Sequence, residues 1–507
     1  MNTPMPFPTH LPASFRAVRA VPLRRVLVLA LSVALGACAT GPAYERPALD
    51  IATAYKEAGI DGKLWKAAEP RDHLPRGPWW EMFGDAVLND LAGQVTVNNQ
   101  NILLAHAKYR QAQALIQSAR AAYFPAFTLG AGETRARNAV AGVAAPAPTT
   151  TDSASVSVSN WELDLWGRLG GAVDANTASA QAALADVESA KLSMTTQLTQ
   201  AYFSLRLLDE QIRLLNRSAD EYKKALDLTQ NRYTGGVAAK SDVTQALTQL
   251  KSTQAQAIDA GIARAQFEHS IAVLTGKLPA QLSLTVAVLT AKLPAIPLTA
   301  PSDLLERRPD IAAAERRVAA ANAQIGVATA ALFPALTLSG TAGYRATNST
   351  WANLLTLPNR FWSFGPALAF TLFDGGAKRS QIALAEALHD QSAAAYRQTV
   401  LTAFQNVEDS LAALRILDAE AGIQREAVSA AEESLFHVLN QYKAGTATYL
   451  NVVTAQTAAL SNSRALLTVQ GSQYQASINL ITALGGGFDV RHAAEPAGGG
   501  VPPPVAR

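Results

Sequence analysis

Apolar and polar residues alternate strictly in residues 335–345, directly after a segment with helical character. One set of alternate positions consists of Leu336, Leu338, Gly340, Ala342 and Tyr344, and the other of Thr337, Ser339, Thr341, Gly343 and Arg345. Alternation of this kind predicts a strand with one apolar face. About ten such residues are enough for a tilted strand to cross a bilayer, so the pattern indicates a membrane strand.

Three further segments, 126–137, 153–165 and 361–373, have strand character, and the last has apolar residues at every second position. The segment 153–165 alternates through Val158, changes phase and continues from Trp161. Such a phase change predicts a β-bulge or a change of environment. The chain is therefore expected to contribute four strands, arranged as two pairs.

Two stretches without proline, 167–277 and 375–484, predict long helices, because proline interrupts a helix interior. Apolar residues of the first stretch follow three- and four-residue spacing, which predicts a coiled-coil-like seam: Leu198, Tyr202, Leu205, Ile212, Leu215, Ala219, Tyr222, Leu226 and Tyr233. This helix is expected to form a rod of about 95 Å. It should then turn at Gly235-Gly236 into a helix capped by Ser241, and the second stretch should turn at Gly445. Shorter helices are expected at about 85–97 and 100–123.

The two halves of the chain repeat each other. Residues 124–129, FPAFTL, match residues 333–338, FPALTL, at an offset of 209 (333 − 124 = 209). The same offset places Tyr233 over Tyr442 and Gly236 over Gly445. A constant register over roughly two hundred residues indicates an internal duplication. The expected repeats are residues 79–278 and 301–484, joined by an inter-repeat linker, residues 279–300.

The first 37 residues predict a secretory signal: four arginines precede the apolar run 26–34 and the sequence Leu35-Gly36-Ala37-Cys38. Cleavage before Cys38 would leave a lipidated cysteine at the start of an extended N-terminal arm, residues 38–78. The alternatives are an ordinary cleavage site or a chance free cysteine. The glycine- and proline-rich residues 485–507 predict a disordered tail.

Composition excludes several classes of function. A single cysteine rules out a disulfide framework and a cysteine-based zinc site. The net charge of +3 includes the four leader arginines, so the mature chain carries about −1 (3 − 4 = −1) and a nucleic-acid partner is not expected. The sequence contains no HExxH motif, phosphate loop or nucleophile elbow. No catalytic residue, cofactor or metal site is therefore expected.

Away from the seams, the long helices carry uncharged polar residues where a solvated coiled coil normally carries lysine and glutamate. These are Thr195, Thr196, Gln197, Thr199, Gln200, Thr454, Gln456 and Thr457. One interpretation is the wall of a water-filled passage, and the other is a polar exposed face.

Four strands as an open sheet would leave unpaired backbone groups at both edges, which lipid does not tolerate. Two chains would supply eight strands, enough only for a barrel filled by side chains, whereas three would supply twelve and allow a lumen. The chain is therefore expected to associate, with its helices packed around the same axis as a tube.

Several motifs carry a family resemblance: Gly41-Pro42, Tyr44, residues 161–168 (WELDLWGR), residues 301–309, 314–317 (AERR) and 320–326 (AANAQIG), and Phe333-Pro334. With the order of elements, they resemble the TolC-like outer-membrane factors of tripartite export systems, especially the NodT-like or OprM-like lipoprotein branch. The resemblance implies a homotrimer with a twelve-stranded barrel in outer-membrane lipid and a helical tube in the periplasm. It also implies a periplasmic adaptor and an inner-membrane pump of the resistance-nodulation-division type as partners.

The resemblance further implies that the tube closes near the turns of its helical hairpins. The matching positions are Tyr233, Gly236 and Asp242 in the first tip, and Tyr442, Gly445, Asn451 and Thr454 in the second. Asn451 and Thr454 stand where relatives carry carboxylates, so Asp242 is the main candidate charge. Alternatively, Asp242 stabilises a helix start, and the two tyrosines are packing residues of the seams.

The expected function is a passive exit duct for toxic small molecules in the outer membrane of a Gram-negative bacterium, without a cofactor other than a lipid on Cys38. Two alternatives remain open: the outer-membrane channel of a type I protein secretion system, and a lipid-anchored scaffold that conducts nothing. An enzyme is a further class of function, and no catalytic motif supports it.

Overall fold

The computed structural model describes residues 41–48, 55–57, 77–137, 147–294, 307–348 and 351–486. The expected signal peptide, Cys38 and nearly all of the expected tail lie outside the described residues. The chain forms two compact units. Unit 1 comprises Met1–Pro42, Ala122–Ala172 and Ile325–Ile382, and unit 2 comprises Ala43–Ala121, Val173–Gln324 and Ala383–Arg507. Each unit therefore takes residues from both expected repeats.

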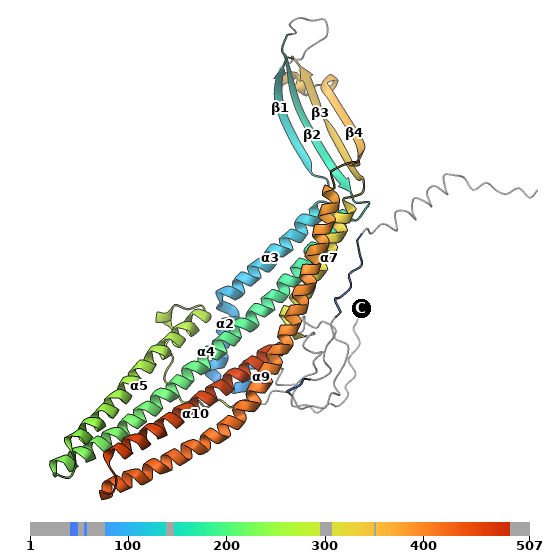
Figure 1. Cartoon of the computed structure of the whole chain (residues 1–507). Coiled ribbons are helices and arrows are strands. Elements are labelled where there is room, and N and C mark those ends of the chain that lie inside the picture. The colour runs from blue at the N-terminus through green and yellow to red at the C-terminus, as the bar shows by residue number, and fades with distance from the viewer. Residues whose placement is uncertain are drawn as a thin grey trace, which may run out of the picture. The chain divides into compact units, whose positions relative to one another are not determined.

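Unit 1 contains one antiparallel sheet with the strand order β1-β2-β3-β4 (Figure 1). Its strands are β1 (Phe127–Ala136), β2 (Thr149–Leu163), β3 (Ala335–Thr347) and β4 (Arg360–Ala369). Strand β2 begins before the expected residue 153, and β4 ends before the expected residue 373. The short elements α8 (Trp351–Leu354) and η3 (Leu357–Asn359) precede β4.

The strand register brings the apolar positions of the four strands to one face. Val156 of β2 and Trp362 of β4 both pair with Ala342 of β3, so their side chains share a face. The register of β2 against β3 shifts between Val158 and Trp161, and Asn160 there has a positive φ of 53°. The shift confirms the predicted bulge. It keeps Trp161 on the apolar face although the sequence phase changes.

Unit 2 is helical, and three long helices of the first half of the chain have counterparts in the second half, although the ends of some of these helices belong to unit 1. The first half has η1 (Trp79–Phe83), α2 (Ala86–Asn98), α3 (Gln100–Ala121), α4 (Arg168–Thr234), α5 (Lys240–Leu274) and η2 (Pro279–Gln281), and the second half has α7 (Pro309–Ala330), α9 (Ala377–Ala444) and α10 (Tyr449–Ala483). Helices α3 and α7 have 22 residues each, α4 and α9 have 67 and 68, and α5 and α10 have 35 each. In the part of the chain that is described, no helix has the length and apolarity needed to span a membrane.

The predicted seam of α4 forms much of the core of unit 2. Leu198, Leu205 and Leu215 are fully buried, and Tyr222 is 3% exposed. Tyr222 lies in a cluster with Leu250 of α5, and its hydroxyl donates to the Gln456 carbonyl oxygen of α10 at 3.1 Å. The seam therefore packs α4 against other helices of the same chain, as the three- and four-residue spacing predicts.

The polar positions of these helices do not all line an exposed face. Thr195, Thr196, Thr199 and Gln456 are buried, whereas Gln197, Thr454 and Thr457 are exposed. For the four buried residues, the alternative interpretation of a polar exposed face is contradicted. The hydroxyl of Thr199 donates to the Thr195 carbonyl oxygen (2.8 Å), and the hydroxyls of Thr196 and Thr482 are hydrogen-bonded to each other (2.8 Å). A threonine can be buried in a helix because its hydroxyl finds such a partner.

Candidate functional site

The turns α4–α5 and α9–α10 define the hairpin tips, and the two turns have the same hydrogen-bond pattern. Gly236 has a φ of 77° and its amide donates to the Tyr233 carbonyl oxygen, while the next amide donates to the Arg232 carbonyl oxygen. Gly445 has a φ of 82° and the matching bonds to Tyr442 and Gln441. This is the Schellman end of a helix, which needs a left-handed residue. Glycine adopts that conformation without the strain of a side chain.

Tyr442 is buried inside the chain, with 3% of its surface exposed. Its hydroxyl donates to Thr229 Oγ1 of α4 at 3.2 Å, and its ring meets the ring of Tyr449 edge-on at 5.4 Å. Ala246 of α5 and Val452 of α10 complete this cluster. Tyr442 is therefore a packing residue, as the alternative interpretation stated, and it connects the two hairpins of the chain.

Arg232, in the last turn of α4, reaches the end of α9. Its Nη1 atom lies 2.9 Å from the Tyr442 carbonyl oxygen and 3.1 Å from that of Lys443, and its guanidinium lies 4.8 Å from the centre of the Tyr442 ring. A cation at a helix C-terminus is favourable because it meets carbonyl oxygens without intrahelical partners. Sequence reasoning missed Arg232, since its target lies on the other hairpin.

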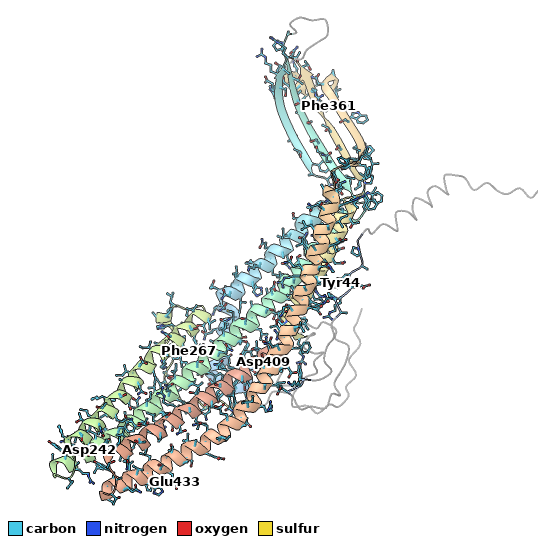
Figure 2. All side chains as sticks on the ribbon, viewed as in Figure 1. Tyr44, Asp242, Phe267, Phe361, Asp409 and Glu433 are labelled. Atoms are coloured by element: carbon cyan, nitrogen blue, oxygen red, sulfur yellow. The ribbon has the colours of Figure 1, made fainter. Side chains whose placement is uncertain are left out.

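The remaining tip residues are more exposed. Tyr233 is 38% exposed, and the Lys240 ammonium lies 5.3 Å from its ring centre. Asp242, which is labelled in Figure 2, is half-buried in the first turn of α5. Asn451 and Thr454 are exposed in the first turns of α10.

Helix α5 begins at Lys240, and its N-cap is Ala239, which makes no side-chain capping bond. Ser241 therefore lies within the first turn, and the prediction that it caps the helix was wrong. Asp242 lies in the same first turn, where a negative charge interacts favourably with the helix dipole, as the alternative interpretation stated.

Tyr449 places a polar atom in the apolar centre of the tips. It is 1% exposed, and its hydroxyl has no hydrogen-bond partner among the described residues. Burial, with smaller contributions from Tyr442, Tyr222 and Asp242, raises the pKa of Tyr449 to about 12. The hydroxyl is therefore neutral at physiological pH, and a buried polar group without a hydrogen bond is costly.

Farther from the tips, α4, α5, α9 and α10 surround an open cavity of about 680 Å³. Its lining is mixed: Leu207 and Phe267 are apolar, and Asp409, Arg464 and Gln475 are polar. Phe267 and Asp409 are labelled in Figure 2. Sequence reasoning singled out none of these residues. Within the described ranges, no cluster of three or more His, Cys, Asp or Glu side chains is arranged to hold a metal ion.

Comparisons with known proteins agree with this architecture. Residues 91–277 and 300–486 each match the family model described as outer membrane efflux protein. The chain is 29% identical over 468 residues to outer membrane protein OprJ of Pseudomonas aeruginosa, covering 92% of this chain and 96% of OprJ. It is 31% identical over 473 residues to the toluene efflux pump outer membrane protein TtgF of Pseudomonas putida, covering 91% and 97%. The structure of the outer-membrane channel OprN superposes with a TM-score of 0.80 at 29% identity, covering 89% of this chain and 99% of OprN.

Proposed function

The chain belongs to the outer membrane efflux protein family, and from this membership we propose that it is the exit duct through which a pump of the resistance-nodulation-division type expels toxic small molecules. It is an outer-membrane channel of a tripartite efflux system and works with a periplasmic adaptor and an inner-membrane pump. The name of its relative TtgF refers to a toluene efflux pump, which supports a small-molecule cargo over a secreted polypeptide.

The two faces of the sheet carry the proposal. On one face, Phe127, Leu129, Trp362 and Phe364 are each between 68% and 78% exposed. The opposite face carries serine, threonine and glycine at the paired positions, such as Ser157 opposite Thr341. An exposed apolar face of this kind is unfavourable in water and fits contact with lipid.

Strands β1 and β4 are the edges of the sheet in one chain. Unpaired edges cannot remain in lipid, so we infer that each β4 pairs with β1 of a neighbouring copy. Three copies would close a twelve-stranded barrel with its polar face toward a lumen. The proposed assembly is therefore a homotrimer in the outer membrane, anchored by a lipid on Cys38.

The helical part supports a tube built from duplicated hairpins. The two family matches begin at residues 91 and 300, an offset of 209 (300 − 91 = 209) that equals the offset between the sequence repeats. In the proposed trimer, six hairpins surround one passage, and their tips form its periplasmic entrance. The tip residues Tyr233, Gly236, Asp242, Gly445, Asn451 and Thr454 are proposed to shape that entrance. Arg232 and Tyr442 are proposed to hold the hairpins together.

The native mass of the mature protein in detergent, with bound detergent subtracted, tests the closure of the barrel. The expected result is the mass of three protomers, together with discrete conductance steps in a planar bilayer. A folded monomer without conductance would overturn the proposed duct and favour the scaffold. Export of dyes by cells that carry the pump and adaptor, compared with export of a polypeptide, tests the cargo.

A further inference from the structure

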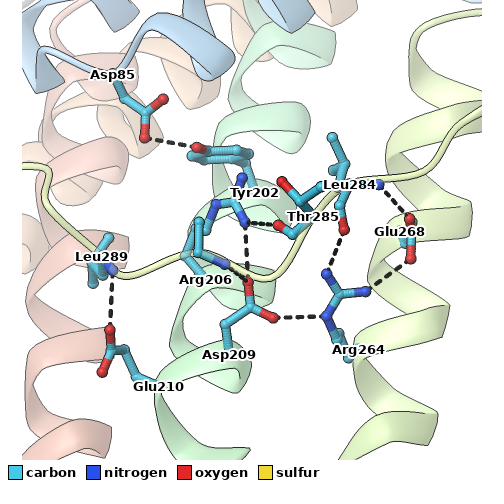
Figure 3. Close-up of polar contacts among 11 residues, drawn as sticks. Asp85, Tyr202, Arg206, Asp209, Glu210, Arg264, Glu268, Leu284, Thr285 and Leu289 are labelled. Carbon is cyan, nitrogen blue, oxygen red and sulfur yellow. Dashed lines mark hydrogen bonds and ion pairs between the residues drawn. The ribbon is translucent and has the colours of Figure 1, made fainter. Parts of the chain in front are cut away.

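The cavity of about 680 Å³ lies on the side of α4 that faces away from α2 and from the inter-repeat linker. On the covered side, the Tyr202 hydroxyl donates to Asp85, the N-cap of α2, at 2.7 Å, and Arg206 donates to the Thr285 carbonyl oxygen of the linker at 2.8 Å (Figure 3). Ser204, which lines the cavity, is two residues from each of them. Two residues correspond to about 200° around a helix, so the cavity and the linker lie on nearly opposite sides of α4.

Helix α10 is divided in the same way. Tyr474 belongs to the hydrophobic cluster that contains Leu88 of α2, and its hydroxyl donates to the Ala291 carbonyl oxygen of the linker. Ser472 and Asn479, on the other side of α10, line the cavity. Among the described residues, only those of α4, α5, α9 and α10 line it. If the hairpins surround a passage, as proposed above, we infer that this uncovered side faces the passage.

The cavity exists because small residues lie where the four helices meet. At Gly471 of α10, a Cβ atom would stand 2.8 Å from Cδ1 of Leu207, so glycine leaves room for the leucine. Ala413 of α9 and Ser472 of α10 leave further space. A volume of several hundred Å³ with an apolar lining and a few polar groups is typical of small-molecule sites. The larger apolar side chains of the lining are Leu207, Leu208, Phe267, Leu417 and Leu467.

The cavity is elongated and carries one charge of each sign. Its lining on α10 runs from Arg464 to Asn479, which is about 22 Å along the helix axis. Asp409 of α9 lies near the Asn479 end, because Leu411 in the next turn packs in one cluster with Leu480. Arg464 lies at the other end, toward the hairpin tips. Asp409 and Arg464 are the charged residues of the lining.

Both charges are available to a molecule in the cavity. Asp409 is exposed and accepts a hydrogen bond from Gln405 Nε2 at 3.3 Å. Arg464 is exposed and donates to Gln256 Oε1 at 2.9 Å. These partners are neutral amides, so each charge keeps its field toward the cavity. A bound cation would be attracted by Asp409 and repelled by Arg464, which gives it one preferred orientation.

We propose that this cavity is a binding site for an elongated amphipathic cation, with the cationic end at Asp409 and the apolar rings against the leucines and Phe267. The inference rests on the proposed function, because it gives the exit duct a site at which cargo of this chemical class pauses. The site is open on one side and its charges are exposed, so binding is weak. Weak binding suits a passage that must release what enters it.

Binding of rhodamine 6G, a flat aromatic cation, to the full-length mature protein in detergent tests the site. Fluorescence polarisation gives the Kd, with protein-free micelles as the blank. Asp409→Asn should weaken binding by about threefold to fivefold, because an exposed charge contributes modestly. Arg464→Gln should strengthen binding by about twofold, because it removes a like charge. Ser472→Leu should fill the cavity and weaken binding by about tenfold or more.

Matched variants separate this site from general binding to the helices. Asp418→Asn and Ser461→Leu make the same changes at exposed positions of α9 and α10 outside the cavity, and both should leave the Kd unchanged. Fluorescein, an anionic dye of similar size, should bind more weakly than rhodamine 6G, and Asp409→Asn should not weaken its binding further.

Equal affinities of the parent, Asp409→Asn and Ser472→Leu proteins would overturn the site. An equal loss of affinity in Asp418→Asn and Ser461→Leu would also overturn it, because the dye would then bind the helical surface in general. In a planar bilayer, the dye should briefly interrupt the conductance of the parent and not that of Ser472→Leu. Binding without such interruptions would overturn the placement of the cavity in the passage.

Failure of the site and failure of the duct give different results. A conducting trimer that does not bind the dye would overturn the site and leave the duct standing. A non-conducting protein that binds the dye at Asp409 would overturn the duct and leave the site standing.

Discussion

Tyr449 and Arg232 show how single side chains decide the energetics of the hairpin tips. Tyr449 has an unbonded hydroxyl in an apolar cluster, whereas Arg232 supplies donors to two carbonyl oxygens at the end of α9. The first should weaken the packing at the tips, and the second should strengthen the attachment of one hairpin to the other. Both effects are measurable because each side chain can be replaced by one of similar shape.

Replacing Tyr449 with phenylalanine removes the unbonded hydroxyl, so unfolding stability at pH 8 should be unchanged or higher by up to about 1 kcal/mol. Burial raises the pKa of Tyr449 from 10.0 to about 12 in the folded state. The unfolded chain therefore ionises first, so the free energy of unfolding is unaffected by this group below pH 10 and falls as the pH rises toward 12. Denaturant unfolding at pH 8 and pH 11 should show that Tyr449→Phe loses less stability than the parent. The expected difference between the two proteins at pH 11 is about 1 kcal/mol. An identical loss in both proteins would contradict this account.

Arg232→Met keeps the length of the side chain and removes both bonds to α9. The tips should become more open, with amide exchange at residues 440–446 faster by about tenfold. If the tips form the entrance of the duct, conductance in a bilayer should also rise. Arg217→Met, at an exposed position of the same helix, is the control and should change neither quantity.

At the scale of elements, the hairpin turns depend on two glycines with positive φ. Gly236→Ala and Gly445→Ala should each cost about 1 kcal/mol, because a residue with a side chain is strained in the left-handed region. Gly93→Ala is a matched control in the interior of α2, where an added methyl group meets open space. That substitution should stabilise by about 0.5–1 kcal/mol, because alanine favours helix. Thermal unfolding of the three variants compares the effects directly, and a loss of stability in Gly93→Ala equal to that at the turns would refute the argument.

At the scale of the whole molecule, a charge should destabilise the assembled protein on the apolar face of the sheet and be tolerated on the polar face. Trp362→Lys places a charge on the apolar face, which should cost roughly 2–4 kcal/mol if that face meets lipid. Ser363→Lys changes the next residue of the same strand, on the polar face, and should be tolerated. The amount of assembled protein in the outer membrane, measured beside the native mass, distinguishes them. Equal assembly of both variants would count against a lipid-facing sheet.

The sequence by itself determined the features that depend on local periodicity. The alternation in residues 335–345 predicted a strand, because a strand with one apolar face has a period of two. The absence of proline in residues 375–484 predicted long helices, because proline interrupts a helix interior. The phase change after Val158 predicted a bulge or a change of environment, and the register shift corresponds to the bulge. The turn at Gly445 followed from the need for a left-handed residue.

Only the tertiary structure decided which polar groups meet partners far along the chain. Thr196 has the same type of side chain as exposed Thr457, yet it is buried, and its hydroxyl is hydrogen-bonded to that of Thr482 of α10. Arg232 and Arg464 bond to residues more than two hundred positions away. Such pairings leave no periodic trace in the sequence, since they depend on how whole helices pack.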